Sequence, residues 1–280
     1  MTDTDAPRRP GPWDTVATEP DARPSEVPAE ALPENKGQHP LWAIVSTGLL
    51  GGFIWWASGS WIVALAAIVG LFVHEYGHVL AMNRLGMGPA KIFIIPFLGG
   101  AARASRLPKS EWDGVLVSLA GPAFGLMAAV PFLVLYIATR ESTWLLGVFT
   151  IAMLNLINLA PAPPLDGSKA LGPVLARIHP MVEIAAIGLV GLIVVAWGVS
   201  NGSLIFAAFL ALSLIGHLRR GRWRPEGRRL DWREAGFSVG LFVATTLACV
   251  GVALAALLPL AGGSLTDALA IGARYFEFGR

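Results

Sequence analysis

Seven helix-length apolar runs dominate this chain and limit what it can fold into. They cover residues 41–58, 61–83, 112–139, 144–162, 182–199, 203–217 and 236–260. A helix needs about 20 apolar residues to cross a bilayer. Only 14% of the residues are charged and 54% are hydrophobic, whereas soluble domains are about 25% charged. We therefore predict an all-α polytopic membrane protein with about six or seven transmembrane helices.

The basic residues predict an orientation for these helices. With a cytoplasmic N-terminus, 18 of the 21 lysines and arginines fall on the cytoplasmic side, and only Arg140, Arg274 and Arg280 fall on the other. Cytoplasmic loops of membrane proteins carry such an excess of positive charge. We predict a multi-pass protein of a prokaryotic cell membrane, with its N-terminus in the cytoplasm.

The first forty residues differ from the rest. Residues 1–40 are rich in Pro, Glu, Asp, Ala and Arg and contain few β-branched or aromatic residues. Such a segment buries too little apolar surface to offset the entropy of ordering it. We predict a disordered cytoplasmic tail.

Two histidines and a glutamate interrupt the second apolar run. His74, Glu75 and His78 stand between Val73 and Val79, and ionisable groups at membrane depth usually mark a functional site. Residues four apart lie on one face of a helix, so both imidazoles can bind one metal ion with the glutamate beside it. The predicted orientation places this motif within the bilayer, nearer the cytoplasmic side. A zinc site would need a third protein ligand.

Asp166 is the best candidate for that ligand. Three prolines, at 161, 163 and 164, break the fourth apolar run just before it. Irregular backbone at this depth is tolerated only if it is buried in protein or lines a wet cavity. One interpretation is an aspartate that caps a helix in a cytoplasmic loop. The other is a metal ligand, which the matching depth of His74 and His78 favours.

Several motifs together resemble those of the site-2 proteases, zinc metalloproteases that cut transmembrane helices of other proteins. The matching stretches are His74-Glu75-Tyr76-Gly77-His78, Gly99-Gly100, Ala120-Gly121-Pro122 and Asn158-x-x-Pro161-x-Pro163-Pro164-Leu165-Asp166-Gly167. One departure is Ser168-Lys169, where the family commonly has glycine and then arginine. The resemblance covers about residues 41–180 and is to a compact member without PDZ or CBS domains.

The resemblance implies one zinc ion per chain, bound by His74, His78 and Asp166. Glu75 would then act as the general base that takes a proton from the attacking water. Asn158 would steady the substrate carbonyl or the developing oxyanion, although a hydrogen bond between helices explains it equally well. Asn155, one turn earlier, is interpreted as a packing contact.

Residues 88–102 are apolar but too short to cross a bilayer, and prolines and glycines punctuate them. They predict a short β-hairpin that dips into the membrane, which the resemblance supports. Its exposed strand edge could pair with an unwound substrate. The alternative is an interfacial anchor.

The remaining segments are assigned by composition. Residues 41–180 form the predicted metalloprotease core and residues 181–218 accessory transmembrane helices. Residues 219–235 form a basic cytoplasmic loop that contacts anionic lipid rather than nucleic acid, and residues 236–280 a last helix and tail. The predicted partners are a transmembrane protein substrate and membrane lipids, with no nucleic acid. The sequence leaves a homo-oligomer open.

Two rival functions remain. A membrane metalloprotease of the CAAX-processing type would use a glutamate in place of Asp166 as third ligand. A non-catalytic membrane binding protein on the same fold would have no chemical need for Glu75, and the presence of that carboxylate argues against it.

Overall fold

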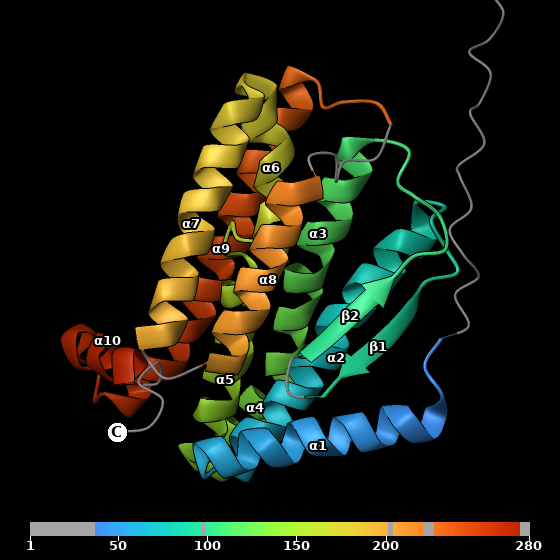
Figure 1. Cartoon of the computed structure of the whole chain (residues 1–280). Coiled ribbons are helices and arrows are strands. Elements are labelled where there is room, and N and C mark those ends of the chain that lie inside the picture. The colour runs from blue at the N-terminus through green and yellow to red at the C-terminus, as the bar shows by residue number, and fades with distance from the viewer. Residues whose placement is uncertain (1–36, 97–98, 201–203, 221–226, 275–280) are drawn as a thin grey trace, which may run out of the picture.

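The computed structural model describes residues 37–96, 99–200, 204–220 and 227–274 (Figure 1). Residues 1–36 of the predicted tail and residues 221–226 of the basic loop lie outside the described residues. The helices are α1 Pro40–Ser58, α2 Trp61–Arg84, α3 Glu111–Gly125, η1 Leu126–Ala128, α4 Ala129–Thr139, α5 Thr143–Asn158, α6 Asp166–Ile178, α7 Pro180–Ser200, α8 Leu204–Arg220, α9 Trp232–Leu260 and α10 Leu265–Arg274, and the strands are β1 Lys91–Ile95 and β2 Gly99–Arg103.

Each of the seven apolar runs is helical over most of its described residues, so the predicted fold class is confirmed. In the part of the chain described, five segments are long and apolar enough to cross a membrane, namely α1, α2, residues 111–139, α7 and α9. Helix α5 and the apolar part of α8 are shorter. Helices α6 and α10 were not predicted.

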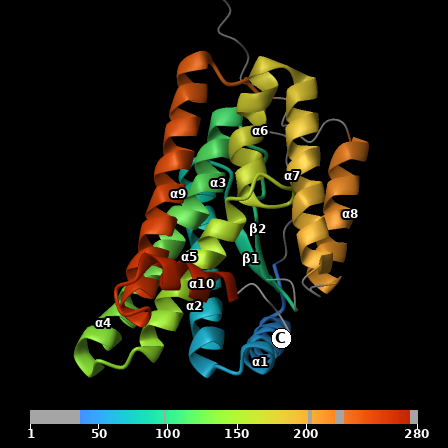
Figure 2. The same cartoon turned by 90° about the vertical axis from the view of Figure 1, so that its left-hand side faces the viewer.

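Helices α3, α5, α7, α8 and α9 run side by side, whereas α1 lies across the end of the bundle where α2 begins (Figures 1 and 2). Much of the core between α2, α5 and α9 is built from small residues, among them Ala66, Ala152, Ala253 and Ala256. Small side chains let helix backbones approach closely, which is the main way helices associate in a membrane. Phe149 and Ile151 fill the space between them.

The long apolar run at 111–139 bends where α3 gives way to α4. Pro131 has no N–H to bond the carbonyl of Met127 four residues earlier, and the helix tightens to a 3₁₀ turn at Leu126–Ala128. At its other end, the Ser110 hydroxyl accepts a hydrogen bond from the Asp113 N–H at 3.1 Å, as expected for a helix cap.

The predicted hairpin is present. Strands β1 and β2 pair antiparallel, with Lys91 opposite Arg103 and Ile95 opposite Gly99. Both strands contact α2, and β1 also contacts α1. The hairpin therefore lies against the helix that carries the two histidines.

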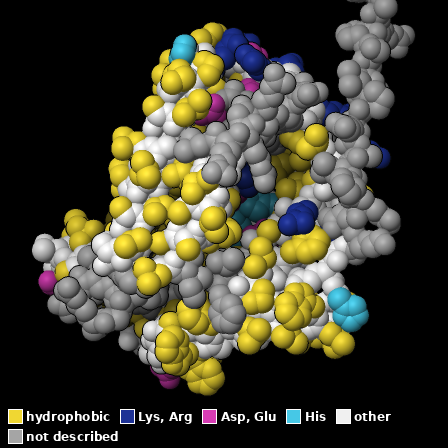
Figure 3. Space-filling model, viewed as in Figure 1, with side chains coloured by type: hydrophobic (Ala, Val, Ile, Leu, Met, Phe, Trp, Pro, Cys, Tyr) yellow, Lys and Arg dark blue, Asp and Glu magenta, His cyan; other side chains and the backbone are white. Residues whose placement is uncertain are grey.

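The segment before α9 is tied to the start of α3. The Glu111 carboxylate accepts a hydrogen bond from the Leu230 N–H at 2.9 Å, and the Glu111 N–H donates to the Arg228 carbonyl at 2.9 Å. The Arg228 guanidinium in turn donates hydrogen bonds to the Glu234 carboxylate, and this contact raises the pKa of Arg228. Basic side chains gather at this upper end of the molecule (Figure 3), so the charge asymmetry of the sequence is also an asymmetry of the fold.

Candidate metal centre

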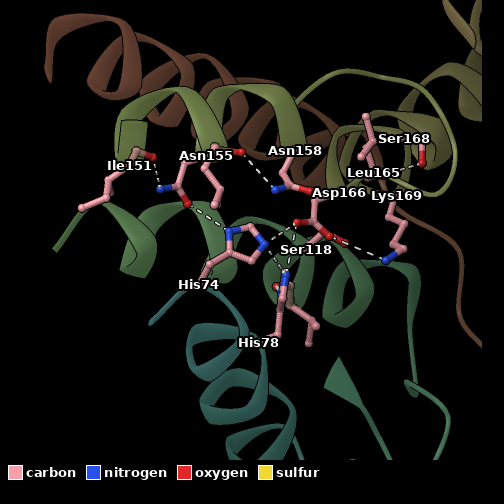
Figure 4. A network of polar contacts seen from close by, with 12 residues as sticks. His74, His78, Ser118, Ile151, Asn155, Asn158, Leu165, Asp166, Ser168 and Lys169 are labelled. Carbon is pink, nitrogen blue, oxygen red and sulfur yellow. Dashed lines mark hydrogen bonds and ion pairs between the residues drawn. The ribbon is translucent and has the colours of Figure 1, made fainter. Parts of the chain in front are cut away.

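The two histidines of α2 face the start of α6. The Nε2 atoms of His74 and His78 are 3.1 Å apart, and each lies 3.1 Å from Oδ2 of Asp166 (Figure 4). Each of the three residues exposes 6% of its surface or less. Asp166, which follows the break in the fourth apolar run, therefore contacts both histidines of α2.

The break itself follows from local sequence. Helix α5 ends at Asn158 and α6 begins at Asp166, so the prolines occupy the turn between them. Gly167 is required there, because a Cβ at this position would collide with the Leu159 carbonyl oxygen. Lys169, one turn into α6, places its ammonium 3.6 Å from the other Asp166 oxygen, Oδ1.

The outer nitrogen of each imidazole is bound to a hydrogen-bond acceptor. Nδ1 of His78 lies 2.8 Å from the Val117 carbonyl oxygen, and Nδ1 of His74 lies 2.9 Å from Oδ1 of Asn155. The Asn155 amide is oriented by its own Nδ2, which donates to the Ile151 carbonyl at 2.8 Å. Both Nδ1 atoms therefore carry the proton, which leaves lone pairs on both Nε2 atoms.

This donor set fits a zinc ion. Two unprotonated imidazole nitrogens and a carboxylate oxygen meet around one point, and lone pairs so close together repel one another unless a cation lies between them. Tetrahedral zinc, with bonds of about 2.0–2.2 Å, separates its ligand atoms by about 3.3 Å. The observed 3.1 Å separations are close to that value. Carbonyl or carboxamide oxygens behind both histidines are also the usual outer partners of zinc ligands.

Glycines allow α2 and α3 to approach each other at this depth. A Cβ on Gly121 of α3 would collide with the His78 ring, and one on Gly77 of α2 would collide with the Ala120 carbonyl oxygen. The Val117 carbonyl reaches His78 from α3 because of this close contact.

Glu75 points toward the hairpin. It exposes 5% of its surface, and a Cβ on Gly100 of β2 would lie 2.7 Å from the Glu75 Cγ. Only glycine leaves room for the glutamate beside the strand. Figure 3 shows a hollow in this face of the molecule, with histidine and basic side chains at its floor.

Of the two asparagines of α5, Asn155 has a contact that its interpretation from the sequence did not include. Asn158 donates from Nδ2 to the Leu154 carbonyl at 3.0 Å, and its predicted substrate role stays a prediction. Asn155, interpreted as a packing contact, is fully buried and binds a metal-site histidine. The outer partner of a zinc-binding imidazole is usually a carboxylate or carbonyl oxygen. The sequence signal for this role was an amide side chain in an apolar helix, about one turn before α5 ends at Asn158.

Comparisons with known proteins agree with this site. Residues 61–145 match the model of peptidase family M50. This segment of the chain is similar to peptidase family M50. The match includes the His-Glu-x-x-His helix, the hairpin and α3, which together supply two of the three candidate metal ligands and the Glu75 carboxylate.

Curated relatives of this chain are named as zinc metalloproteases. One, from Methanocaldococcus jannaschii, is 27% identical over 144 residues, which are 49% of this chain and 40% of the relative. Another, named "Putative zinc metalloprotease Rip3", is found in two strains of Mycobacterium tuberculosis. It is 26% identical over 213 residues, 69% of this chain and 53% of the relative. The chain thus spans about half the length of these relatives or less. No solved structure matches significantly.

Proposed function

We propose that this membrane protein is a zinc-dependent endopeptidase that hydrolyses peptide bonds in or near transmembrane segments of other proteins. The observation that carries the proposal is the convergence of His74, His78 and Asp166 at 3.1 Å beside the buried Glu75. These three residues would hold zinc, which when bound polarises a peptide carbonyl and lowers the pKa of a bound water towards about 7.

The residues of the chain account for the proton transfers. Glu75 directly follows His74, within the helical turn that separates the two histidines, and is not one of the three converging ligands. Its carboxylate takes a proton from the attacking water and then gives that proton to the departing amine. His74 and His78 keep their Nδ1 protons on Asn155 and Val117, so the imidazoles stay in one tautomer throughout.

The hairpin supplies a place for the substrate backbone. A transmembrane helix must unwind before its peptide bonds can be attacked, and an extended peptide can add to a free strand edge. Strand β2 touches Glu75 through Gly100. A peptide paired with the hairpin would therefore be held beside the general base.

Substitution of Glu75 tests this function. In Glu75→Gln, we expect the purified protein to keep about one zinc per chain, because the three ligands are unchanged. Cleavage of a model transmembrane peptide should fall by about 10²–10⁴-fold, the usual contribution of a general acid–base group. Zinc is measured by metal analysis and cleavage by mass spectrometry. Glu141→Gln, an exposed glutamate between α4 and α5, is the matched control. Undiminished cleavage by Glu75→Gln would contradict the mechanism.

A further inference from the structure

The side chain of Gln38 is bound to the hairpin backbone. Its Oε1 accepts a hydrogen bond from the Ile94 N–H at 2.8 Å, and its Nε2 donates to the Ile94 carbonyl at 2.9 Å. Nε2 also lies 3.2 Å from the hydroxyl of Ser46, a fully buried residue of α1. One amide thus joins the start of α1 to the middle of β1.

These contacts identify which edge of the hairpin each backbone group faces. In an antiparallel pair, opposed residues alternate between exchanging hydrogen bonds and pointing away from each other. Ile94 binds Gln38 with both its N–H and its C=O, so its backbone points away from β2. Its partner Gly100 must then point away from β1, and so must Ala102, two residues further on. Glu75 packs against β2 at Gly100, where a Cβ would lie 3.0 Å from Oε1 of the glutamate. Strand β2 is therefore the strand in contact with the general base.

We propose that Gln38 is a positioning residue that closes the outer edge of β1, so that an extended peptide pairs with β2, the strand that packs against Glu75. This inference rests on the proposed function. A peptide paired with β2 would be the direct neighbour of that strand, about 4.8 Å away, whereas a peptide paired with β1 would lie two strand spacings from it. Gln38 therefore selects the productive edge.

The chemistry of an amide suits this task. A glutamine side chain offers one carbonyl acceptor and an N–H donor, the same pair of groups that an incoming strand would present. Free strand edges attract other strands and are commonly covered in folded proteins. The preceding residue, Gly37, adopts a φ of +77°, and a Cβ there would lie 2.9 Å from Cδ of Lys91 at the start of β1, so a glycine suits this position. Helix α1 begins two residues later, at Pro40.

Cysteine cross-linking tests which edge a peptide uses. Cys249 is the only cysteine and is first replaced by alanine. Ile92→Cys on β1 and Ala102→Cys on β2 then form a matched pair, because the two residues lie opposite each other across the hairpin. The probe is a synthetic transmembrane peptide with about 20 apolar residues, a central Asn-Gly pair and one cysteine. With Gln38 present, the peptide should cross-link to position 102 in preference to position 92.

Gln38→Met removes both hydrogen bonds to Ile94 and keeps a side chain of similar length. The preference for position 102 over position 92 should fall by about tenfold, as expected when two hydrogen bonds of modest net strength no longer cover the β1 edge. His39→Ala, at the neighbouring exposed residue, should leave the preference unchanged. Zinc content should stay at the parent value in both variants. An unchanged cross-link ratio in Gln38→Met would overturn the role of Gln38 and leave the proposed protease activity standing.

Hydrogen exchange provides a second measurement that needs neither peptide nor activity. The Ile94 amide should exchange about tenfold faster in Gln38→Met, whereas the Phe93 amide, which faces β2, should keep its rate. Equal exchange at Ile94 in the parent and the variant would also overturn the inference. If the parent cross-links the peptide through neither strand, docking at the hairpin is wrong and Gln38 has no such role. If the parent cross-links at position 102 but cleaves nothing, the proposed protease function alone fails.

Discussion

The five membrane-length apolar segments in the described part of this protein differ in how much of their surface is buried inside the molecule. In the most apolar windows of α2 and of residues 111–139, 56% of residues are buried, compared with 22% in α7 and α9 and 11% in α1. Two carboxylates show the same contrast. Asp166 at the start of α6 and Glu183 on α7 each expose 5% of their surface. Only Asp166 lies within reach of both histidines. Burial of a carboxylate therefore does not by itself identify the candidate metal site. The site is identified by the convergence of two imidazole nitrogens and one carboxylate oxygen.

The difference has a cause in the sequence. Helices α2, α3 and α5 meet through glycines at 70, 77, 121 and 125. A Cβ at any of these positions would press on or collide with a neighbouring side chain or backbone. Close contact brings backbone carbonyls and amides into range of the imidazoles. Helix α7, by contrast, exposes large apolar side chains such as Leu189, Leu192 and Ile193, as expected for a helix facing lipid.

The largest expected effect separates the two buried carboxylates. Asp166→Ala should lose its zinc during purification, because two imidazoles alone do not make a stable zinc site. Glu183→Ala should keep about one zinc per chain. Metal analysis of the two purified variants, with cleavage assayed alongside, checks both expectations. Full zinc occupancy in Asp166→Ala would instead favour the CAAX-type enzyme, in which a glutamate is the third ligand.

The next comparison is between two asparagines of α5, one turn apart. Asn155→Ala removes the acceptor behind His74, and loss of such a partner typically lowers zinc affinity by about 10–100-fold. Asn158→Ala should leave zinc affinity unchanged, since its amide is bound to the Leu154 carbonyl. Competition with a zinc chelator measures both affinities. Equal losses in the two variants would mean that the effect arises from damage to α5 and not from His74.

Two glycines of α3 test the close contact itself. Gly121→Ala places a methyl group against the His78 ring and should destabilise the protein by about 1–3 kcal/mol, with weaker zinc binding. Gly114→Ala, on the same helix, meets no neighbour within 4 Å and should stabilise the helix by about 0.5–1 kcal/mol. Denaturation in detergent solution gives both values. If Gly121→Ala were as stable as Gly114→Ala, the tight α2–α3 contact would be wrong.

Local patterns predicted most of this arrangement. The i, i+4 spacing identified the two histidines, and the proline cluster located the break that carries Asp166. Alternation of apolar residues with Pro and Gly revealed the hairpin. Contacts between distant segments left no such pattern: Asn155 is 81 residues from His74, and Gln38 is 56 residues from Ile94. Helix α6 was missed because it is short and contains both Gly167 and Pro173, residues that disfavour helix interiors.

The smallest expected effect concerns Lys169, at the boundary between the buried site and solvent. Its ammonium lies 3.6 Å from Asp166 Oδ1, but half of its side chain is exposed, so solvent and salt screen the pair. Lys169→Met should therefore change zinc affinity by only about two- to fivefold, the range of exposed ion pairs, and towards tighter binding because the ammonium repels the metal cation. Lys169→Arg should preserve the affinity, and about 1 M salt should abolish the difference between Lys169→Met and the parent. A loss as large as that of Asn155→Ala would show instead that the site depends on this cation as strongly as on its buried hydrogen bonds. The half-exposed Lys169 would then count, with the buried residues of α2, α3 and α5, among the groups that hold the site together.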